Sequence, residues 1–312
     1  MIEMKLLRSA INYKHIIFSL LLIIYICIKK FNIINKMKIC ICTYGKIENR
    51  YIREFVQHYE KYGVDKIFLY DNNYINGEKY EEVINDYINK GFVEILNWRG
   101  KKFVLRKIMN DCYLRNYLKY DWLMFYEIDE FIHLKNYKNI KYFLNEKKFV
   151  GCDLVHLNLL CHTDNNLLYY ENKTLRERFP KIVSPNKTLG RRLEIKFILK
   201  GHIPKISIDN VHRCNTKLIS CNGFGSKHKY RGIYSTQPDF YYYYIDHYYS
   251  KSTQEFIEKI NKGAHIRSIR YKLHRIDKYF NQNDITKEKI EMIEKGTGFN
   301  LSNYKKKLKS LS

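Results

Sequence analysis

Three carboxylates follow a run of large apolar residues in the middle of the chain. The run extends from Trp122 to Tyr126, and the carboxylates are Glu127, Asp129 and Glu130. If the strand continues, Glu127 and Asp129 share a face, because residues two apart in a strand point the same way. Carboxylates that point together repel each other unless a cation or a proton relieves them. A divalent ion does so and leaves positions open for phosphate oxygens. The stretch therefore predicts a metal site, with a solvated strand end as the alternative.

Alternating strands and helices precede this stretch. The pattern predicts strands at 37–43, 66–70 and 92–96, helices at 48–62, 80–90 and 101–119, and a fourth strand in 122–132. Apolar residues recur at helical spacing in the helices and form short continuous runs in the strands. Each strand–helix–strand unit implies parallel pairing with a right-handed crossover. We therefore expect an α/β fold with a mostly parallel sheet flanked by helices.

Polar residues end three of these strands. Thr43 ends the first, Asp71 follows the second, and the carboxylates end the fourth. In open α/β sheets, ligands bind beyond the carboxyl ends of the strands. Because the three polar groups fall at one edge of the predicted sheet, we expect one site there rather than three unrelated turns.

Two other classes of protein also fit an apolar strand that ends in acids. Nucleotide hydrolases have this feature, but they require the motif GxxxxGK[ST]. The chain lacks the motif, since Gly223 to Lys227 has the wrong spacing. A metal-dependent nuclease is the stronger rival, with Glu194 and Lys196 on one strand and Asp153 as its second carboxylate.

Several short motifs follow one another in a particular order from about Lys38 to Gly263. They are Lys46-Ile-Glu48, Ile52-Arg-Glu54-Phe with His58, Gly63 to Asn72, Asn110-Asp111-Cys112, Glu127 to Phe131, Lys196, Val211-His212, His247-Tyr-Tyr-Ser-Lys251-Ser252, Glu255-Phe256 and Lys259. In this order and spacing, the chain resembles glycosyltransferase family 92, a former domain of unknown function, and the related family-2-like transferases. The resemblance covers most of the chain and implies the Rossmann-like GT-A fold.

The resemblance also implies an activity and its site. The activity would be the inverting, metal-dependent transfer of a hexose from a nucleotide sugar, UDP-hexose favoured, to a glycan or glycoconjugate acceptor. The metal, Mn²⁺ or Mg²⁺, would be bound by Glu127, Asp129 and His247. The nucleotide sugar would contact Thr43, Glu48, Asp71, Asn72 and Lys251, with Lys251 at the diphosphate. Glu127 departs from the family pattern, which usually has Asp at this position.

Two carboxylates are candidates for the general base. Inverting transfer requires one group that takes the proton of the acceptor hydroxyl. Asp164 follows a strand-like run where we expect the acceptor to bind, and Glu130 is the other candidate.

A non-catalytic, membrane-bound carbohydrate-binding protein with the same fold is a further alternative to the enzyme.

The composition is strongly basic and contains several cysteines. The formal net charge of +24 over 312 residues favours anionic partners, which include nucleic acid, anionic lipid and phosphorylated small molecules. Together with the resemblance, it leads us to expect a membrane surface and a sugar nucleotide as partners, and no nucleic acid. The eight cysteines contain no CxxC pair and no zinc-binding spacing, so we expect free buried thiols.

The two ends of the chain differ from its middle. Ile16 to Ile28 is an apolar run between lysines, shorter than the ~17–25 residues of a spanning helix, although flanking lysines extend its reach. We expect an N-terminal segment at 1–36 with a membrane anchor at 16–28, a catalytic domain at 37–265 and a basic helical tail at 266–312. The protein would then be membrane-associated through a single-pass anchor. Basic residues flank the run on both sides, so its orientation is undecided. Met37 is an alternative start.

Overall fold

The structure is a computed structural model. It describes residues 18–26, 28–29, 32–184, 193–215, 217–227, 234–235, 239–262 and 269–310. The chain divides into two compact units, residues 1–38 and residues 39–312, and each is described by itself.

In the N-terminal unit, residues 18–26, 28–29 and 32–36 are helical. The apolar side chains from Leu20 to Ile26 are exposed. Among the described residues, no helix combines the length and the apolar character that a membrane span requires. Residues 16, 17 and 27 of the predicted anchor lie outside the described residues.

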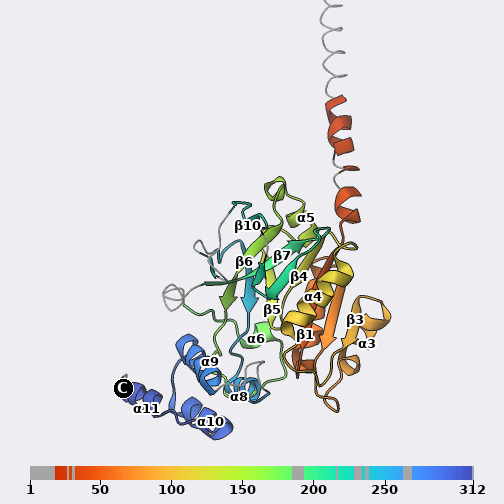
Figure 1. Ribbon diagram of the computed structural model, residues 1–312. Helices are drawn as coiled ribbons and strands as arrows, with labels where there is room; N and C mark the ends of the chain where they lie inside the picture. Colours follow the sequence, from red (N-terminus) through yellow and green to blue (C-terminus); the bar gives the residue numbers. More distant parts are fainter. Residues whose placement is uncertain are drawn as a thin grey trace, which may run out of the picture. The chain divides into compact units, whose positions relative to one another are not determined.

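Four parallel strands form one half of the large sheet in the second unit (Figure 1). They are β1 (Ile39–Gly45), β2 (Lys66–Asp71), β3 (Val93–Asn97) and β4 (Trp122–Phe125), in the order β3-β2-β1-β4. The connecting helices are α2 (Asn49–Lys61), α3 (Glu81–Asn89) and α4 (Leu105–Asn116). Because neighbouring strands in this half pair in parallel, the predicted alternation of strands and helices is confirmed.

The predicted fourth strand is wrong in its second half. β4 ends at Phe125, residues 126–129 form a turn, and a new strand, β5 (Glu130–Leu134), follows. β4 pairs with β1, whereas β5 pairs with β12 (Tyr243–His247) at the other end of the strand order. Glu127 and Asp129 therefore belong to a turn, Glu130 begins β5, and the alternation of one continuous strand does not set the directions of all three carboxylates.

The second half of the sheet is mixed. Its strands are β7 (Leu193–Lys200), β6 (Leu154–Cys161), β12 and β5, with β10 (Ser220–Asn222) beside β6 and β11 (Tyr234–Ser235) beside β7. β7 and β5 run antiparallel to their neighbours in this half, while β6 and β12 are parallel. The predicted α/β fold with a mostly parallel sheet and flanking helices is thus confirmed.

Shorter elements occupy the connections. They are α5 (Ile140–Leu144), the 3-10 helix η1 (Lys147–Phe149), α6 (Leu175–Arg178) and a separate two-stranded ribbon of β8 (Ser207–Asn210) and β9 (Arg213–Asn215).

The last strand of the sheet lies against α2. His58 Nε2 lies 3.0 Å from the carbonyl oxygen of Ile132. The Tyr59 hydroxyl donates to the carbonyl oxygen of Glu130 at 2.9 Å and accepts from the backbone nitrogen of Ile132 at 3.2 Å. These bonds pair backbone groups on the edge of β5 that would otherwise be open to another strand. They also fix the position of Glu130 relative to α2.

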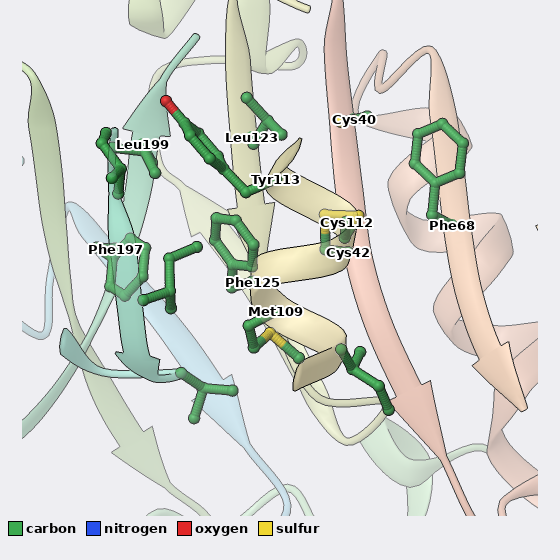
Figure 2. Close-up of a cluster of buried hydrophobic side chains, with 14 of the residues drawn as sticks. Cys40, Cys42, Phe68, Met109, Cys112, Tyr113, Leu123, Phe125, Phe197 and Leu199 are labelled. Carbon is green, nitrogen blue, oxygen red and sulfur yellow. A yellow bond between two sulfur atoms is a disulfide. The ribbon is translucent and has the colours of Figure 1, made fainter. Parts of the chain in front are cut away.

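The core between the parallel strands and α4 contains a disulfide. Figure 2 shows Cys42 of β1 bonded to Cys112 of α4, among apolar side chains from β4, β7 and α4. A second disulfide joins Cys152 to Cys221. The expectation of free thiols is therefore wrong for these four cysteines. The partners are 70 and 69 residues apart, so spacing gave no sign that folding would bring them together.

Four helices at the C-terminal end share a second apolar core. They are α8 (Thr253–Asn261), α9 (Ile269–Gln282), α10 (Lys287–Thr297) and α11 (Ser302–Lys309). Phe256 of α8 stacks on Tyr279 of α9 at 4.2 Å between ring centroids, and Ile293 of α10 is buried in the same core. This core spans residue 265, where we placed the boundary between the catalytic domain and the tail.

Candidate functional site

The turn between β4 and β5 brings its own carboxylates together. The backbone nitrogen of Glu127 donates to Glu130 Oε2 at 3.0 Å, and the backbone nitrogen of Glu130 donates to the carbonyl oxygen of Glu127 at 3.0 Å. Tyr126 and Ile128 are buried and anchor the turn. The Glu130 side chain is fully buried, that of Asp129 is 8% exposed and that of Glu127 is 34% exposed. Glu127 is thus the most accessible of the three carboxylates.

Lys196 bridges two of these carboxylates. Its Nζ lies 3.0 Å from Glu127 Oε2 and 2.9 Å from Glu130 Oε1, and its side chain is fully buried. It reaches both because β7 lies beside β4, which leads into the turn. The hydroxyl of Tyr44, on β1, donates to Glu127 Oε1 at 3.1 Å. Burial raises the pKa of Glu130 to about 8, and Lys196 offsets only part of that rise.

Asp129 holds two further lysines. Lys251 Nζ and Lys259 Nζ each donate to Asp129 Oδ2 at 3.1 Å. Lys251 also lies 3.5 Å from Glu48 Oε2, so Glu48 joins the same network. Burial alone would raise the pKa of Asp129, but Lys251 and Lys259 outweigh it and hold that pKa well below its usual value. Asp129 is therefore a carboxylate anion that positions two ammonium groups.

His247 faces these carboxylates from β12. It is directly opposite Glu130 in the antiparallel pairing of β12 with β5, which places both side chains on one face. His247 Nε2 lies 3.8 Å from Asp129 Oδ1 and 3.9 Å from Glu130 Oε1. Its Nδ1 is buried and has no hydrogen-bond partner among the described residues. Burial lowers the pKa of His247 to about 3, so the imidazole is neutral and retains a lone pair.

The site contains a set of donor atoms that fits a divalent cation. One ligand atom from each of Glu127, Glu130 and His247 lies within 4.8 Å of the other two. Two carboxylates and a neutral imidazole are suitable ligands for Mn²⁺. The predicted set contained Asp129 in place of Glu130, and Asp129 is engaged by two lysines instead. Lys196 holds the same two glutamates, so a cation would compete with it. The metal itself stays a prediction.

Three of the residues predicted to bind the nucleotide sugar lie at the ends of β1 and β2. Asp71 Oδ2 accepts from Arg99 Nε at 2.6 Å, and Asn72 Nδ2 donates to two backbone carbonyls of the loop after β3 at 2.9 Å each. Thr43 Oγ1 is buried and has no hydrogen-bond partner among the described residues. The structure therefore places Thr43, Asp71 and Asn72 on neighbouring strands, without bonds to the turn.

Asp164 lies in a different polar network. Its Oδ2 is 2.7 Å from Lys289 Nζ and accepts from the Tyr279 hydroxyl at 2.6 Å, while Oδ1 accepts from the backbone nitrogen of Asn166 at 2.9 Å. Asp164 thereby ties the loop after β6 to α9 and α10. Both of its oxygens are engaged, so the geometry gives no support to Asp164 as the general base. The other candidate, Glu130, lies in the turn but is fully buried.

The residues of the nuclease alternative are far apart. The backbone nitrogen of Lys200, at the end of β7, donates to the carbonyl oxygen of Asp153, whereas Glu194 lies near the start of β7. At ~3.3 Å per residue, Asp153 and Glu194 are roughly 20 Å apart along the strand. Lys196 bridges the glutamates of the turn instead. The geometry therefore contradicts this interpretation.

Comparison with known proteins places the chain in a family. The model of glycosyltransferase family 92 matches residues 35–295. This chain belongs to glycosyltransferase family 92. A curated family 92 protein from Ricinus communis is 28% identical over 127 residues, and one from Oryza sativa subsp. japonica is 29% identical over 125 residues. Each match covers 40% of this chain but only 22% and 21% of those proteins, so it spans about a fifth of their length.

Solved structures give weaker matches to this family 92 chain. A crystal structure of S. aureus TarS matches with a TM-score of 0.35 and 11% identity over 79% of this chain and 43% of that one. TarS 1–349 in complex with UDP-GlcNAc also matches with a TM-score of 0.35, at 13% identity, over 84% of this chain and 80% of that one. Because these TM-scores are low, we carry no property of TarS over to the family 92 chain.

The structure adds three residues to the site that the sequence predicted for this family 92 chain. They are Tyr44, Lys196 and Lys259. Lys196 had a signal, because it is a lone charge within the apolar run of β7. It stood among the motifs of the resemblance and in the nuclease alternative, and neither predicted its partners in the turn. Lys259 stands among the motifs of the resemblance, from which we predicted no role for it at the site.

Proposed function

We propose that this family 92 protein transfers a hexose from a nucleotide sugar, with UDP-hexose as the favoured donor, to a hydroxyl group of a glycan or glycoconjugate. The observation that carries the proposal is the set of buried charges at the turn. There, three carboxylates hold the ammonium groups of Lys196, Lys251 and Lys259. Cations that are already in place stabilise a leaving diphosphate without the cost of reorganisation.

The residues divide into three roles in this proposal. Thr43, Asp71 and Asn72 contact the nucleoside from the ends of β1 and β2. Lys251 contacts the diphosphate as a point charge. Glu48 supports Lys251, since its carboxylate lies 3.5 Å from the ammonium group.

A divalent cation is part of the proposal. Glu127, Glu130 and His247 would hold Mn²⁺ or Mg²⁺, with Asp129 beside them. When bound, the ion would supply positive charge next to the diphosphate leaving group. Tyr44 orients Glu127 through its hydroxyl, and the backbone of the turn orients Glu130.

We also propose inversion at the anomeric carbon, as the resemblance implies. Nuclear magnetic resonance of the product would show an anomeric configuration opposite to that of the donor. Retention of configuration would refute this part of the proposal and leave the donor site unaffected.

We further propose that the protein acts at an anionic membrane surface. The apolar run at 16–28 and the net charge of +24 support this localisation.

A thermal-shift panel tests the donor site. The protein is heated with UDP-, GDP-, CMP- and dTDP-sugars, each with Mn²⁺ and with a chelator. We expect the UDP-sugar to raise the melting temperature, and to raise it further with Mn²⁺, because a ligand that binds only the folded state stabilises that state. If no nucleotide sugar shifts the melting temperature of the folded protein, the donor site is refuted.

An Asp129→Asn variant tests turnover. The neutral amide no longer balances Lys251 and Lys259, so we expect transfer or donor hydrolysis to fall about 100-fold, as when one preorganised charge contact is removed. Glu82→Gln is the control, because Glu82 is an exposed acid on α3. Equal activity in Asp129→Asn and wild type would contradict the role of the turn. A wild type that binds nucleotide sugar but never turns it over would favour the non-catalytic alternative.

A further inference from the structure

Three cations surround the ring of Tyr249, which lies beside His247. The two ring centroids are 5.7 Å apart. Lys259 Nζ lies 4.4 Å and Lys278 Nζ 4.5 Å from the centroid of Tyr249. Arg275 Cζ lies 5.7 Å from the same centroid, and Arg275 Nε donates to the Tyr249 hydroxyl at 3.1 Å. We call Lys259, Arg275 and Lys278 the Tyr249 cations.

The Tyr249 cations are unequally neutralised. Lys259 donates to Asp129 at 3.1 Å, and Lys278 donates to both carboxylate oxygens of Glu194 at 3.2 Å. Arg275 is partly buried, and no carboxylate of the described residues forms an ion pair with it. An aromatic ring and a hydroxyl compensate a guanidinium group only in part. Like charges gathered in a partly buried place favour the binding of an anion.

The Tyr249 cations continue the row of charges that begins at the turn. Lys259 donates to the same oxygen of Asp129 as Lys251, so the two ammonium groups are adjacent. From Lys259 the row passes across Tyr249 to Arg275 and Lys278 on α9. A guanidinium group binds two phosphate oxygens at once, and lysines add point charges. This combination of groups suits a diphosphate better than a single carboxylate.

We propose that the Tyr249 cations form a subsite for the diphosphate of the sugar-nucleotide donor, next to Lys251. The inference rests on the proposed function, because the donor supplies the diphosphate. It makes α9 part of the binding site, although the sequence placed α9 in a basic tail.

The test is the binding of inorganic pyrophosphate to the full chain, measured by calorimetry in the presence of a chelator and at constant ionic strength. The chelator leaves the side chains as the only cations at the site. We expect Arg275→Met to weaken binding about tenfold or more, as expected for the loss of a hydrogen-bonded charge. Arg270→Met, an exposed arginine of the same helix, is the matched control and should bind as wild type. No binding by wild type, or equal weakening in both variants, would overturn the inference.

Two further variants test whether Arg275 acts through its charge or by holding α9 in place. Tyr249→Phe removes the bond to Arg275 but keeps all the Tyr249 cations, so it should weaken pyrophosphate binding less than Arg275→Met does. Arg275→Lys keeps the charge but loses the guanidinium group that binds two oxygens at once, so its affinity should lie between those of Arg275→Met and wild type. If Tyr249→Phe weakens binding as much as Arg275→Met, Arg275 acts by holding α9 in place and the inference fails. Melting temperatures of all variants show whether they are folded.

The same measurement distinguishes this inference from the proposed function. Pyrophosphate binding requires no turnover, so a loss on Arg275→Met in a protein that uses no nucleotide sugar would refute the function and keep the anion subsite. Transfer from a nucleotide sugar, with unchanged pyrophosphate binding in Arg275→Met, would keep the function and refute the subsite.

Discussion

Lys196 is a charged residue in the interior of a strand whose neighbours, Ile195 and Phe197, belong to the core. A buried ammonium group is costly unless carboxylates compensate it. Glu127 and Glu130 do so from the turn, at 3.0 and 2.9 Å. Lys196 therefore couples the order of the turn to the stability of the sheet.

We expect Lys196→Met to lower the free energy of unfolding by about 3–5 kcal/mol, because it leaves buried carboxylate charge without its partner. Urea unfolding measures this change. Adding Glu130→Gln should restore part of the loss, since a neutral amide replaces the uncompensated carboxylate. Lys200→Met, at the exposed end of the same strand, is the control. Equal losses for Lys196→Met and Lys200→Met would contradict the coupling.

Among the elements, the two disulfides cross-link segments that are about 70 residues apart in the chain. Cys42–Cys112 fixes α4 to β1 inside the core (Figure 2), and Cys152–Cys221 fixes the segment before β6 to β10. Disulfides form and persist in oxidising compartments. Whether the two disulfide bonds persist therefore depends on the redox conditions around the protein.

For the Cys152–Cys221 pair we expect a double Cys→Ala variant to lose about 4 kcal/mol of unfolding free energy, the loop-closure value for a cross-link of this length. Denaturant unfolding of the variant, and of wild type with and without a reducing agent, measures it. Cys214→Ala, which removes a free cysteine, is the control. A wild-type midpoint that does not respond to reduction would argue against the disulfides.

The whole chain contains 56 basic and 32 acidic residues, which leaves a formal net charge of +24. Part of the excess surrounds the turn and Tyr249, where buried carboxylates already balance several cations. Many other basic side chains of the described residues are exposed, and these attract anionic surfaces with a range set by the ionic strength. Charge at the site and charge at the surface therefore have different dependence on salt.

Flotation of the full chain with vesicles containing phosphatidylserine tests the surface charge. We expect binding at ~0.1 M salt, where the Debye length is about 10 Å, and loss of the charge-driven part at ~1 M, where it is about 3 Å. Vesicles of phosphatidylcholine alone are the control, and any binding to them reports the apolar run at 16–28. If neither vesicle floats the protein at low salt, the proposed membrane localisation is wrong.

What the sequence determined by itself was the parallel half of the fold and the place of the carboxylates. Local periodicity is enough for this, because strands and helices bury their apolar faces at spacings visible within ten or so residues. The ends of β1, β2 and β4 then had to meet at one edge, whichever way the rest of the sheet paired.

Only the tertiary structure decided which charged side chains pair with each other. The end of β4 at Phe125 could not be predicted from the sequence, because the apolar run continues beyond it. β5 is a separate strand because it pairs with β12, which local propensity does not reveal. Lys196 and Lys259 reach the carboxylates across more than 60 residues of chain from Glu130. Such contacts depend on how the sheet and α8 pack, and a side chain's partners at long sequence distance leave no local pattern.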